Sequence, residues 1–244
     1  MRWYLIFSFL LMMPRLAFAM SVDELLGLLD KNLTFDTREA MLTMTVVRAD
    51  RTKTYKMHSY SRGQTESAME YLEPARDKGT RMLRMGNDLW MYMPSVERTQ
   101  KISGHMLRQS MMGSDMSYED MMDAASWKER YTGTVDGEEV LDGRKCWKMT
   151  LIAKTPDVTY AKRIVWVDQQ SYIPLRQELY AVSGMLLKVW AMSNVQTVEG
   201  RQWPSRMVIE DKVQQGSRTE LIFDSVDFSV ELQAEVFSTR WLER

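Results

Sequence analysis

The sequence predicts a mainly β protein, an antiparallel meander of roughly ten strands that is closed or partly closed into a barrel. Three observations lead to this prediction. From Glu39 onward, apolar and polar residues alternate with the two-residue period of β-strands. Turn dipeptides then recur at Asp136-Gly137, Asp142-Gly143, Ser183-Gly184, Glu199-Gly200 and Gln215-Gly216. Several of the predicted strands are apolar on both faces, which means that something covers each face.

The first 19 residues, MRWYLIFSFLLMMPRLAFA, have the layout of a secretory signal peptide. Arg2 precedes an apolar run from Trp3 to Met13, and Ala17-Phe18-Ala19 supplies the small residues for cleavage after Ala19. The apolar run is much shorter than the roughly 20 residues that a membrane-spanning helix needs. We therefore expect export, followed by cleavage after Ala19.

The expected mature chain, residues 20–244, has the size of a single domain. Its 30 basic and 33 acidic residues give a net charge of −3, since residues 1–19 carry two arginines and no acid. Nucleic acid is not an expected partner, because binding it needs a clustered basic excess. The single cysteine, Cys146, cannot form an internal disulfide, and its place in a strand-like run predicts a small buried side chain.

The first predicted element is a helix at residues 21–32, SVDELLGLLDKN, with an apolar stripe of leucines and with Ser21 or Asp23 as its cap. A hairpin follows at residues 40–49 and 52–61, joined at Asp50-Arg51. The other predicted strands lie at residues 80–85, 88–94, 133–143, 145–154, 160–169, 173–184, 185–195, 203–212 and 218–228. We expect a single domain, because no Pro/Ser/Gly-rich linker or charge block interrupts this series.

The strand LWMYMP is apolar on both faces, since Leu89, Met91 and Met93 point one way while Trp90 and Tyr92 point the other. The two predicted helices, at residues 22–31 and near 118–125, are too short to cover both faces of such a sheet. An apolar concavity that the chain's own side chains leave unfilled follows as a hypothesis.

Methionine is concentrated in one part of the chain, because ten of the 22 methionines lie between Met82 and Met122. The stretch MMGSDMSYEDMM, residues 111–122, contains the helix-start pattern Ser117-x-x-Asp120, which explains the acids among the methionines. Two interpretations stay open: a mobile lid over a cavity, or a plug that fills the core with flexible side chains. The candidate cavity and lid residues are Trp90, Tyr92, Met93, Met111, Met112, Met116, Tyr118, Met121, Met122 and Trp166.

The central part of the sequence resembles the LolA-like family of outer-membrane lipoprotein-sorting proteins. The motifs that carry this resemblance are Pro74 with Lys78-Gly79-Thr80, Trp90-x-Tyr92-x-Pro94, Arg98 with Lys101-Ile102, Met112-Gly113-Ser114-Asp115, Ser117-Tyr118-Glu119-Asp120 and Trp166-Val167-Asp168. This likeness spans essentially the whole expected mature chain, and its central block is the specific part.

The resemblance implies a strongly curved antiparallel sheet, an incomplete barrel, with short helices covering a hydrophobic cavity. It also implies a periplasmic carrier that holds acyl chains of lipoproteins or lipids between the inner and outer membranes. Such a carrier is expected to be a monomer that touches membranes transiently and works with an inner-membrane transporter of the ABC or RND type. The family supplies no catalytic residues to transfer.

Five basic residues bracket the methionine-rich block, and they either contact anionic headgroups or a partner, or simply solvate a face. These residues are Arg81, Arg84, Arg98, Lys101 and Arg108.

Enzyme classes find little support in the sequence. His58 and His105 have no further ligand at a recognisable spacing, so no metal site is predicted, and no nucleotide or cofactor motif occurs. Asp115, Glu119 and Asp120 are explained by helix-start chemistry more simply than by acid–base catalysis. The alternative to a carrier is an RseB-like periplasmic sensor, an interaction module that binds a membrane regulator.

Overall fold

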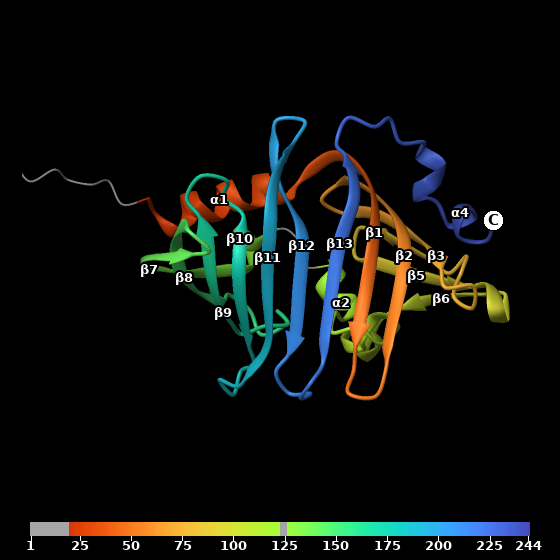
Figure 1. The fold of residues 1–244 in the computed structure, drawn as a ribbon, viewed down its shortest axis with the longest axis horizontal. Coiled ribbons are helices and arrows are strands. Elements are labelled where there is room, and N and C mark those ends of the chain that lie inside the picture. The colour runs from red at the N-terminus through yellow and green to blue at the C-terminus, as the bar shows by residue number, and fades with distance from the viewer. Residues whose placement is uncertain (1–19, 123–125) are drawn as a thin grey trace, which may run out of the picture.

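The computed structural model describes residues 20–122 and 126–244. The predicted signal peptide, residues 1–19, lies outside the described residues, as do the last three residues of the helix that we predicted near 118–125. The described part of the chain folds around one antiparallel sheet (Figure 1).

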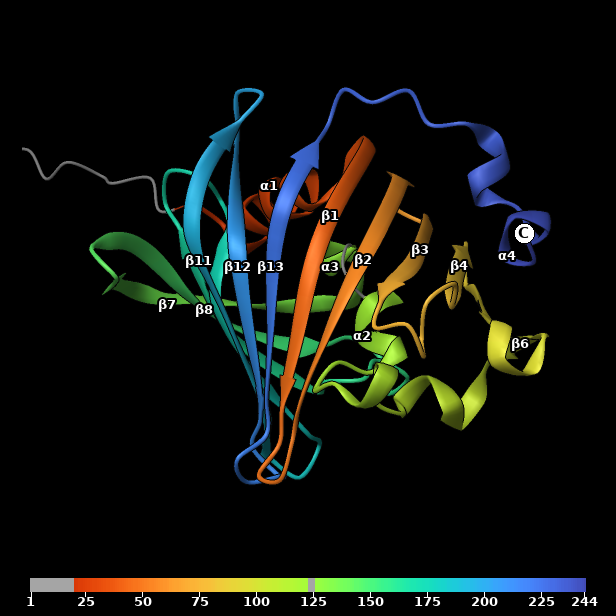
Figure 2. The ribbon, with the colours of Figure 1, turned by 45° about the vertical axis from the view of Figure 1, so that its right-hand side comes forward.

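The sheet contains thirteen strands among the described residues, in the order β6-β5-β4-β3-β2-β1-β13-β12-β11-β10-β9-β8-β7. They are β1 (Phe35–Val47), β2 (Thr52–Gly63), β3 (Glu66–Glu73), β4 (Arg81–Met85), β5 (Asp88–Met93), β6 (Arg98–Ile102), β7 (Tyr131–Leu141), β8 (Arg144–Ala153), β9 (Lys162–Asp168), β10 (Pro174–Tyr180), β11 (Leu186–Val198), β12 (Arg201–Asp211) and β13 (Arg218–Asp227). The edge strands β6 and β7 do not pair with each other, so the predicted incomplete barrel is confirmed. The sheet bends so strongly that β7 and β8 run across the direction of β12 and β13 (Figure 2).

The sequence prediction missed two strands, β3 and β6. Only Ile102 of β6 is buried, because β6 is a five-residue edge strand with one covered face, and such a segment shows no apolar period. In β3, Ala68 and Tyr71 are both buried although they lie three residues apart, because the two faces of this strand are covered by different parts of the chain.

The helices are few and short. They are α1 (Val22–Leu33), α2 (Tyr118–Met122), α3 (Trp127–Arg130) and α4 (Thr239–Leu242), with the 3₁₀ turns η1 (Pro94–Val96), η2 (Gly104–Arg108), η3 (Met111–Gly113) and η4 (Ala234–Phe237). The predicted first helix is confirmed, with Ser21 as its cap: the Glu24 backbone N–H donates to Ser21 Oγ over 3.3 Å, and the Ser21 backbone N–H donates to Glu24 Oε2 over 2.9 Å. Leu25, Leu26 and Leu29 are fully buried against the inner side of β7–β9.

The inner, concave side of the sheet carries most of the core. Strand pairing places Leu42 opposite Met57 and Met44 opposite Tyr55, and all four side chains are buried on this side. On the outer side, the C-terminal segment packs over β3–β5, where Phe237 and Trp241 contact the partly buried Trp90, Tyr92 and their neighbours. Both faces of β5 are therefore covered, as the apolar character of this strand predicted.

Residues 103–130, which we call the crossing segment, connect β6 to β7. Since these are the two edge strands at opposite ends of the sheet, the chain has to cross from one edge of the curved sheet to the other. Figure 2 shows the described part of this segment, residues 103–122 and 126–130, with α2, on the inner side of the curve. The topology thus explains why the methionine-rich stretch lies over the concave face.

Asp168, at the end of β9, forms a buried ion pair that makes stability depend on pH. Its carboxylate, 2% exposed, accepts hydrogen bonds from Arg144 Nε (3.0 Å) and NH2 (2.9 Å) and from the Ser171 backbone N–H (2.8 Å) and hydroxyl (2.6 Å). Burial alone raises the pKa of Asp168, but the hydrogen bonds from Arg144 and Ser171 outweigh burial and hold this pKa below its usual value.

We expect the Asp168→Asn variant to be less stable than the wild type by about 2 kcal/mol at pH 7. Because the folded protein has the lower pKa, the carboxylate stabilises it above pH ~4 and loses this effect as the pH falls through the folded-state value. Urea unfolding at pH 7 and at pH 3 measures this, and the difference between the two proteins should shrink at the lower pH. An equal difference at both pH values would contradict the role of the charge.

Candidate functional site

The concave face encloses a cavity with a volume of about 270 Å³. Strands β1–β4 and β9–β13, the end of α1 and the crossing segment contribute to its wall. Its apolar part is formed by side chains from both halves of the sheet and from the crossing segment: Leu42, Met57, Met69, Met111, Met116, Met121, Leu179, Trp190, Met192, Met207, Leu221 and Phe223. The chain therefore leaves a mostly apolar space inside its own core.

The wall changes from polar to apolar along the β1–β2 pair. Arg38 lies opposite Ser61, Ala40 opposite Ser59, and Leu42 opposite Met57, all on the inner face. Ser59 and Ser61 are 4% and 8% exposed, although a buried hydroxyl is favourable only when it is hydrogen-bonded. The Arg38–Ser61 end of this strand pair can thus solvate a polar group, whereas the Leu42–Met57 end is apolar.

Arg38 is a cation at the polar end. Its NH2 group donates to Ser61 Oγ over 2.9 Å, and its guanidinium lies 5.1 Å from the ring centre of Phe35 and 5.5 Å from that of Trp203. Its Nε is shielded from solvent and has no hydrogen-bond partner among the described residues. Burial lowers the pKa of Arg38 to about 10, so the side chain is still charged at neutral pH.

Asp115 ties the crossing segment to one end of the sheet. Its buried carboxylate accepts hydrogen bonds from Thr219 Oγ1 (2.6 Å) and from the Ser217 hydroxyl, and it forms an ion pair with Arg48 NH1 at 3.1 Å. Arg48 also donates to the carbonyl of Gly113. These contacts join η3 to the ends of β1 and β13.

Asp120 is the second tie. Its carboxylate, buried in α2, accepts from the Tyr160 hydroxyl (2.5 Å) and forms an ion pair with Lys188 Nζ on β11 (2.6 Å). The predicted helix start is confirmed as well, because the Ser117 N–H donates to Asp120 Oδ2 (2.8 Å) and the Asp120 N–H donates to Ser117 Oγ (3.1 Å). Asp115 and Asp120 are therefore anchors, and Met111, which precedes them, and Met116, which lies between them, both line the cavity.

Of the ten predicted cavity and lid residues, Met111, Met116 and Met121 line the cavity. Four others pack into the same apolar cluster without lining it: Met93, Met112, Tyr118 and Met122. Their role in binding stays a prediction, because they lie behind the residues that line the cavity.

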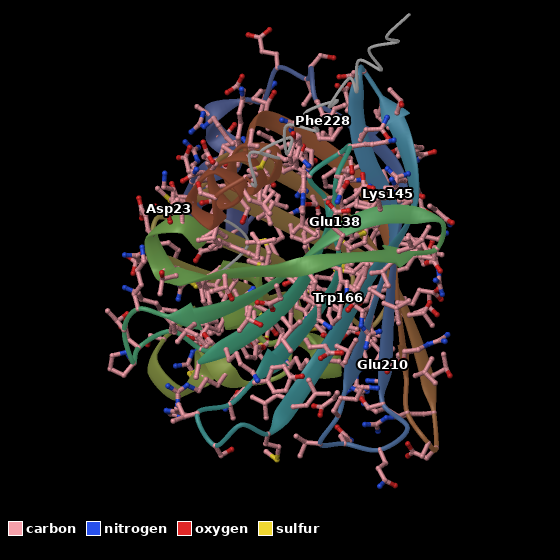
Figure 3. The ribbon with its side chains drawn as sticks, turned by 90° about the vertical axis from the view of Figure 1, so that its left-hand side faces the viewer. Asp23, Glu138, Lys145, Trp166, Glu210 and Phe228 are labelled. Carbon is pink, nitrogen blue, oxygen red and sulfur yellow. The ribbon has the colours of Figure 1, made fainter. Side chains whose placement is uncertain are left out.

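The assignment of Trp90, Tyr92 and Trp166 to the cavity is wrong. Strand alternation turns Trp90 and Tyr92 away from Met91, and they lie on the outer side under the C-terminal segment. Trp166 packs with Cys146 on the opposite side of β9 from α1, where its indole N–H donates to Glu139 Oε2 over 2.6 Å. Figure 3 looks onto this end of the molecule and labels Trp166.

The five basic residues predicted to contact a headgroup or partner lie in different places, and of these five only Arg84 lines the cavity. Arg81 lies on the outer side and donates to the carbonyl of Trp241 over 3.1 Å. Lys101 pairs with Asp88 at 2.7 Å, while Arg98 and Arg108 are exposed on the surface. Cys146 is fully buried, as predicted, and burial raises the pKa of its thiol.

Sequence reasoning missed Arg38, Ser59 and Ser61. The signal was present, since Arg38 is in phase with Ala40 and Leu42 on the apolar face of its strand. Among the described residues, no group of three or more His, Cys, Asp or Glu side chains is placed to hold a metal ion. No helix in the described part of the chain is long and apolar enough to cross a membrane.

Comparison with known proteins adds a family to this geometry. Residues 63–244 match a family model described as "uncharacterized protein". A search of the curated proteins found no match.

Three solved structures are similar over nearly the whole chain. A LolA superfamily protein from Nitrosomonas europaea is 26% identical, with a TM-score of 0.75 over 91% of this chain and 100% of its own. A DUF1329 family protein from Desulfovibrio piger is 24% identical, with a TM-score of 0.85 over 90% and 97% of the two chains. A Vibrio parahaemolyticus domain assigned to outer membrane lipoprotein sorting is 23% identical, with a TM-score of 0.82 over 91% and 98%.

Proposed function

Because this chain belongs to a LolA-like family, we propose that it is a periplasmic carrier for the acyl chains of lipoproteins or lipids. The carrier shields the hydrocarbon from water while it moves between the inner and the outer membrane. The observation that carries this proposal is the apolar cavity on the concave face, closed on one side by the methionines of the crossing segment.

The size of the cavity fits part of an acyl chain. An apolar cavity of about 150 Å³ takes up benzene, so 270 Å³ has room for roughly ten carbon atoms by the same proportion. Burial contributes about 0.8 kcal/mol per methylene, or on the order of 8 kcal/mol for such a length before the ordering of the chain is subtracted. This is sufficient for useful binding without preventing release.

Methionine suits a wall that has to accept longer chains. Its three rotatable bonds let the side chain repack around guests of different length and shape. Met116 and Met121 belong to the crossing segment, and Met57 and Met207 belong to the sheet, so the wall can yield on both sides of the space. The anchors Asp115 and Asp120 hold the backbone in place while these side chains move.

Net transfer needs a donor and an acceptor, since a membrane is as apolar as the cavity. We propose that an inner-membrane transporter of the ABC or RND type loads the carrier, that the carrier acts as a monomer with only transient membrane contact, and that the protein has no catalytic role. A sensor of the RseB type is the competing proposal. A transporter gene beside this gene favours the carrier, whereas a gene for an anti-sigma factor favours the sensor.

Native mass spectrometry of protein purified from the periplasm of its own host tests the proposal directly. We expect a mass that exceeds that of the polypeptide and an excess that disappears on extraction with organic solvent, which yields a lipid or an acylated peptide. Protein that carries no extractable lipid, and that also fails to take up fatty acids from vesicles, would rule out the carrier.

The Ser59→Phe variant tests whether the cavity is the binding site. Ser59 is buried on the inner face of β2, so a phenyl ring at this position projects into the space that the acyl chain needs. We expect lipid occupancy in the native mass spectrum to fall at least about tenfold. The matched control is Ser225→Phe, because Ser225 is exposed on β13, and this variant should keep its lipid. Equal occupancy in two folded variants would place the lipid elsewhere.

A further inference from the structure

Arg38 is an ionised side chain without a counter-ion in the described part of the chain. Its only hydrogen bond there goes to the neutral hydroxyl of Ser61, its other neighbours are the rings of Phe35 and Trp203, and its Nε–H is left without an acceptor. A buried charge is costly unless an opposite charge or several hydrogen bonds compensate it. An arginine that lines a cavity and has an unpaired donor is therefore a place where a ligand with acceptor atoms gains affinity.

Arg38 is one end of a row of polar side chains across the concave face. The strand register places Arg38 opposite Ser61, Ser61 opposite Ser67, and Ser67 opposite Arg84, which spans four adjacent strands from β1 to β4. All four side chains line the cavity. The two guanidinium groups can only donate hydrogen bonds, whereas the two serine hydroxyls between them can both donate and accept.

The acids in the cavity wall do not pair with Arg38. Glu66 is occupied by Arg62, with Nε–Oε2 and NH2–Oε1 distances of 2.7 and 3.1 Å, and Asp120 is paired with Lys188. Arg163, a third arginine in the wall, donates to neutral acceptors, the Tyr131 hydroxyl at 2.8 Å and Gln177 Oε1 at 3.3 Å. Among the described residues, Arg38 thus has no carboxylate partner in the wall.

The next two rows along the same strands are mostly apolar. The row next to Arg38–Ser61–Ser67–Arg84 contains Ala40, Ser59, Met69 and Met82, and the one after that contains Leu42, Met57 and Tyr71. A ligand that satisfies both ends of this gradient has an anionic group at one end and a hydrocarbon chain at the other. Arginine matches carboxylate and phosphate oxygens in this way, because its planar fork donates two parallel hydrogen bonds.

We propose that the row Arg38–Ser61–Ser67–Arg84 binds the anionic headgroup, a carboxylate or a phosphate, of an amphiphile whose single acyl chain enters the methionine-lined part of the cavity. This inference rests on the proposed carrier function and narrows its cargo to anionic amphiphiles. The Arg38 Nε–H and the Arg38 terminal nitrogens donate to the headgroup, and the serine hydroxyls complete its shell.

The test measures binding by isothermal titration calorimetry, below the critical micelle concentration of each probe. The probes are dodecyl phosphate, dodecanoate, the uncharged monolauroylglycerol and inorganic phosphate. We expect the wild type to bind the better of the two anionic amphiphiles about tenfold to a hundredfold more tightly than monolauroylglycerol, in line with a charge-assisted hydrogen bond. Dodecyl phosphate and dodecanoate, compared with each other, identify the preferred anion.

The Arg38→Gln variant should lose this preference and keep the wild-type affinity for monolauroylglycerol. The matched control is Arg206→Gln, because Arg206 lies on β12, pairs with Glu220 at 2.6 Å and does not line the cavity. This control should keep the preference for the anionic probe. A preference that survives in Arg38→Gln, or a wild type that binds the charged and uncharged probes equally, would overturn the inference while the carrier proposal stands.

Two further outcomes separate the inference from its premise. If none of the dodecyl or lauroyl probes binds, the carrier proposal itself fails. If inorganic phosphate alone binds as tightly as dodecyl phosphate and depends on Arg38, the row is a site for free anions, and an amphiphile is excluded as its ligand.

Discussion

Replacing Asp115 with alanine is expected to lower the free energy of unfolding by about 3–5 kcal/mol, because the change removes one partner of a buried ion pair. It leaves the Arg48 guanidinium with no carboxylate at this position, and it leaves the hydroxyls of Ser217 and Thr219 without their acceptor. The Thr219 hydroxyl, which also accepts from the Asp115 backbone N–H over 2.8 Å, keeps that hydrogen bond. For a chain of this size, the melting temperature should fall by about 6–20 °C.

Urea unfolding and hydrogen exchange measure this effect. We expect exchange to accelerate most at the amide of Met111, which donates to the carbonyl of Met116 over 2.8 Å inside the anchored part of the crossing segment. Asp224→Ala is the matched control, since Asp224 is exposed on β13 and its side chain accepts one hydrogen bond within the described residues, from the Thr43 hydroxyl at 2.8 Å. If Asp115→Ala is no more costly than Asp224→Ala, the anchor is not what holds the segment.

Local features of the fold were predictable from the sequence because local rules determine them. The capping box of α1, the β1–β2 hairpin and the Ser117–Asp120 helix start each depend on residues within a few positions of one another. The apolar alternation predicted most strands for the same reason. The strands that were missed, β3 and β6, are those whose burial depends on distant parts of the chain.

The candidate site was harder to predict because long-range contacts assemble it. The partners of Asp115 and Asp120 lie 40 to 104 positions away, so the sequence revealed the helix start but not the anchors. Trp90 and Tyr92 were predicted in the cavity because both faces of β5 are apolar, and nothing local indicates that Phe237 and Trp241 cover the outer one.

The polar row shows what a sequence can reveal once a register is known. Arg38 is the charged residue in phase with the apolar face of β1, and this is visible from the alternation alone. That Ser61, Ser67 and Arg84 lie beside it follows only from the pairing of four strands. A charged residue on the apolar face of a predicted hairpin is thus a useful first sign of a ligand site.

The Arg38→Met variant is expected to be more stable than the ligand-free wild type. Burial lowers the pKa of Arg38 from 12.5 to about 10, and each pKa unit corresponds to about 1.4 kcal/mol. The desolvated charge therefore costs at most about 3 kcal/mol, and less to the extent that solvent reaches this half-buried side chain. Because the folded protein has the lower pKa, this cost is fully present at neutral pH and is relieved only as the pH rises through about 10 toward the unfolded value.

Methionine keeps the apolar stem against Phe35 and Trp203 but removes the charge, at the loss of the cation–π contacts with both rings. We expect a net gain of about 1–3 kcal/mol, measured by urea unfolding at pH 7 after lipid has been removed. Arg206→Met should instead be neutral or slightly destabilising, because Arg206 has a carboxylate partner in Glu220. A side chain that destabilises the ligand-free protein is expected where that side chain binds a ligand, because binding sites keep residues that lower stability. Dodecyl phosphate should accordingly raise the stability of the wild type more than that of Arg38→Met, and an equal rise in both proteins would show that Arg38 does not contact the headgroup.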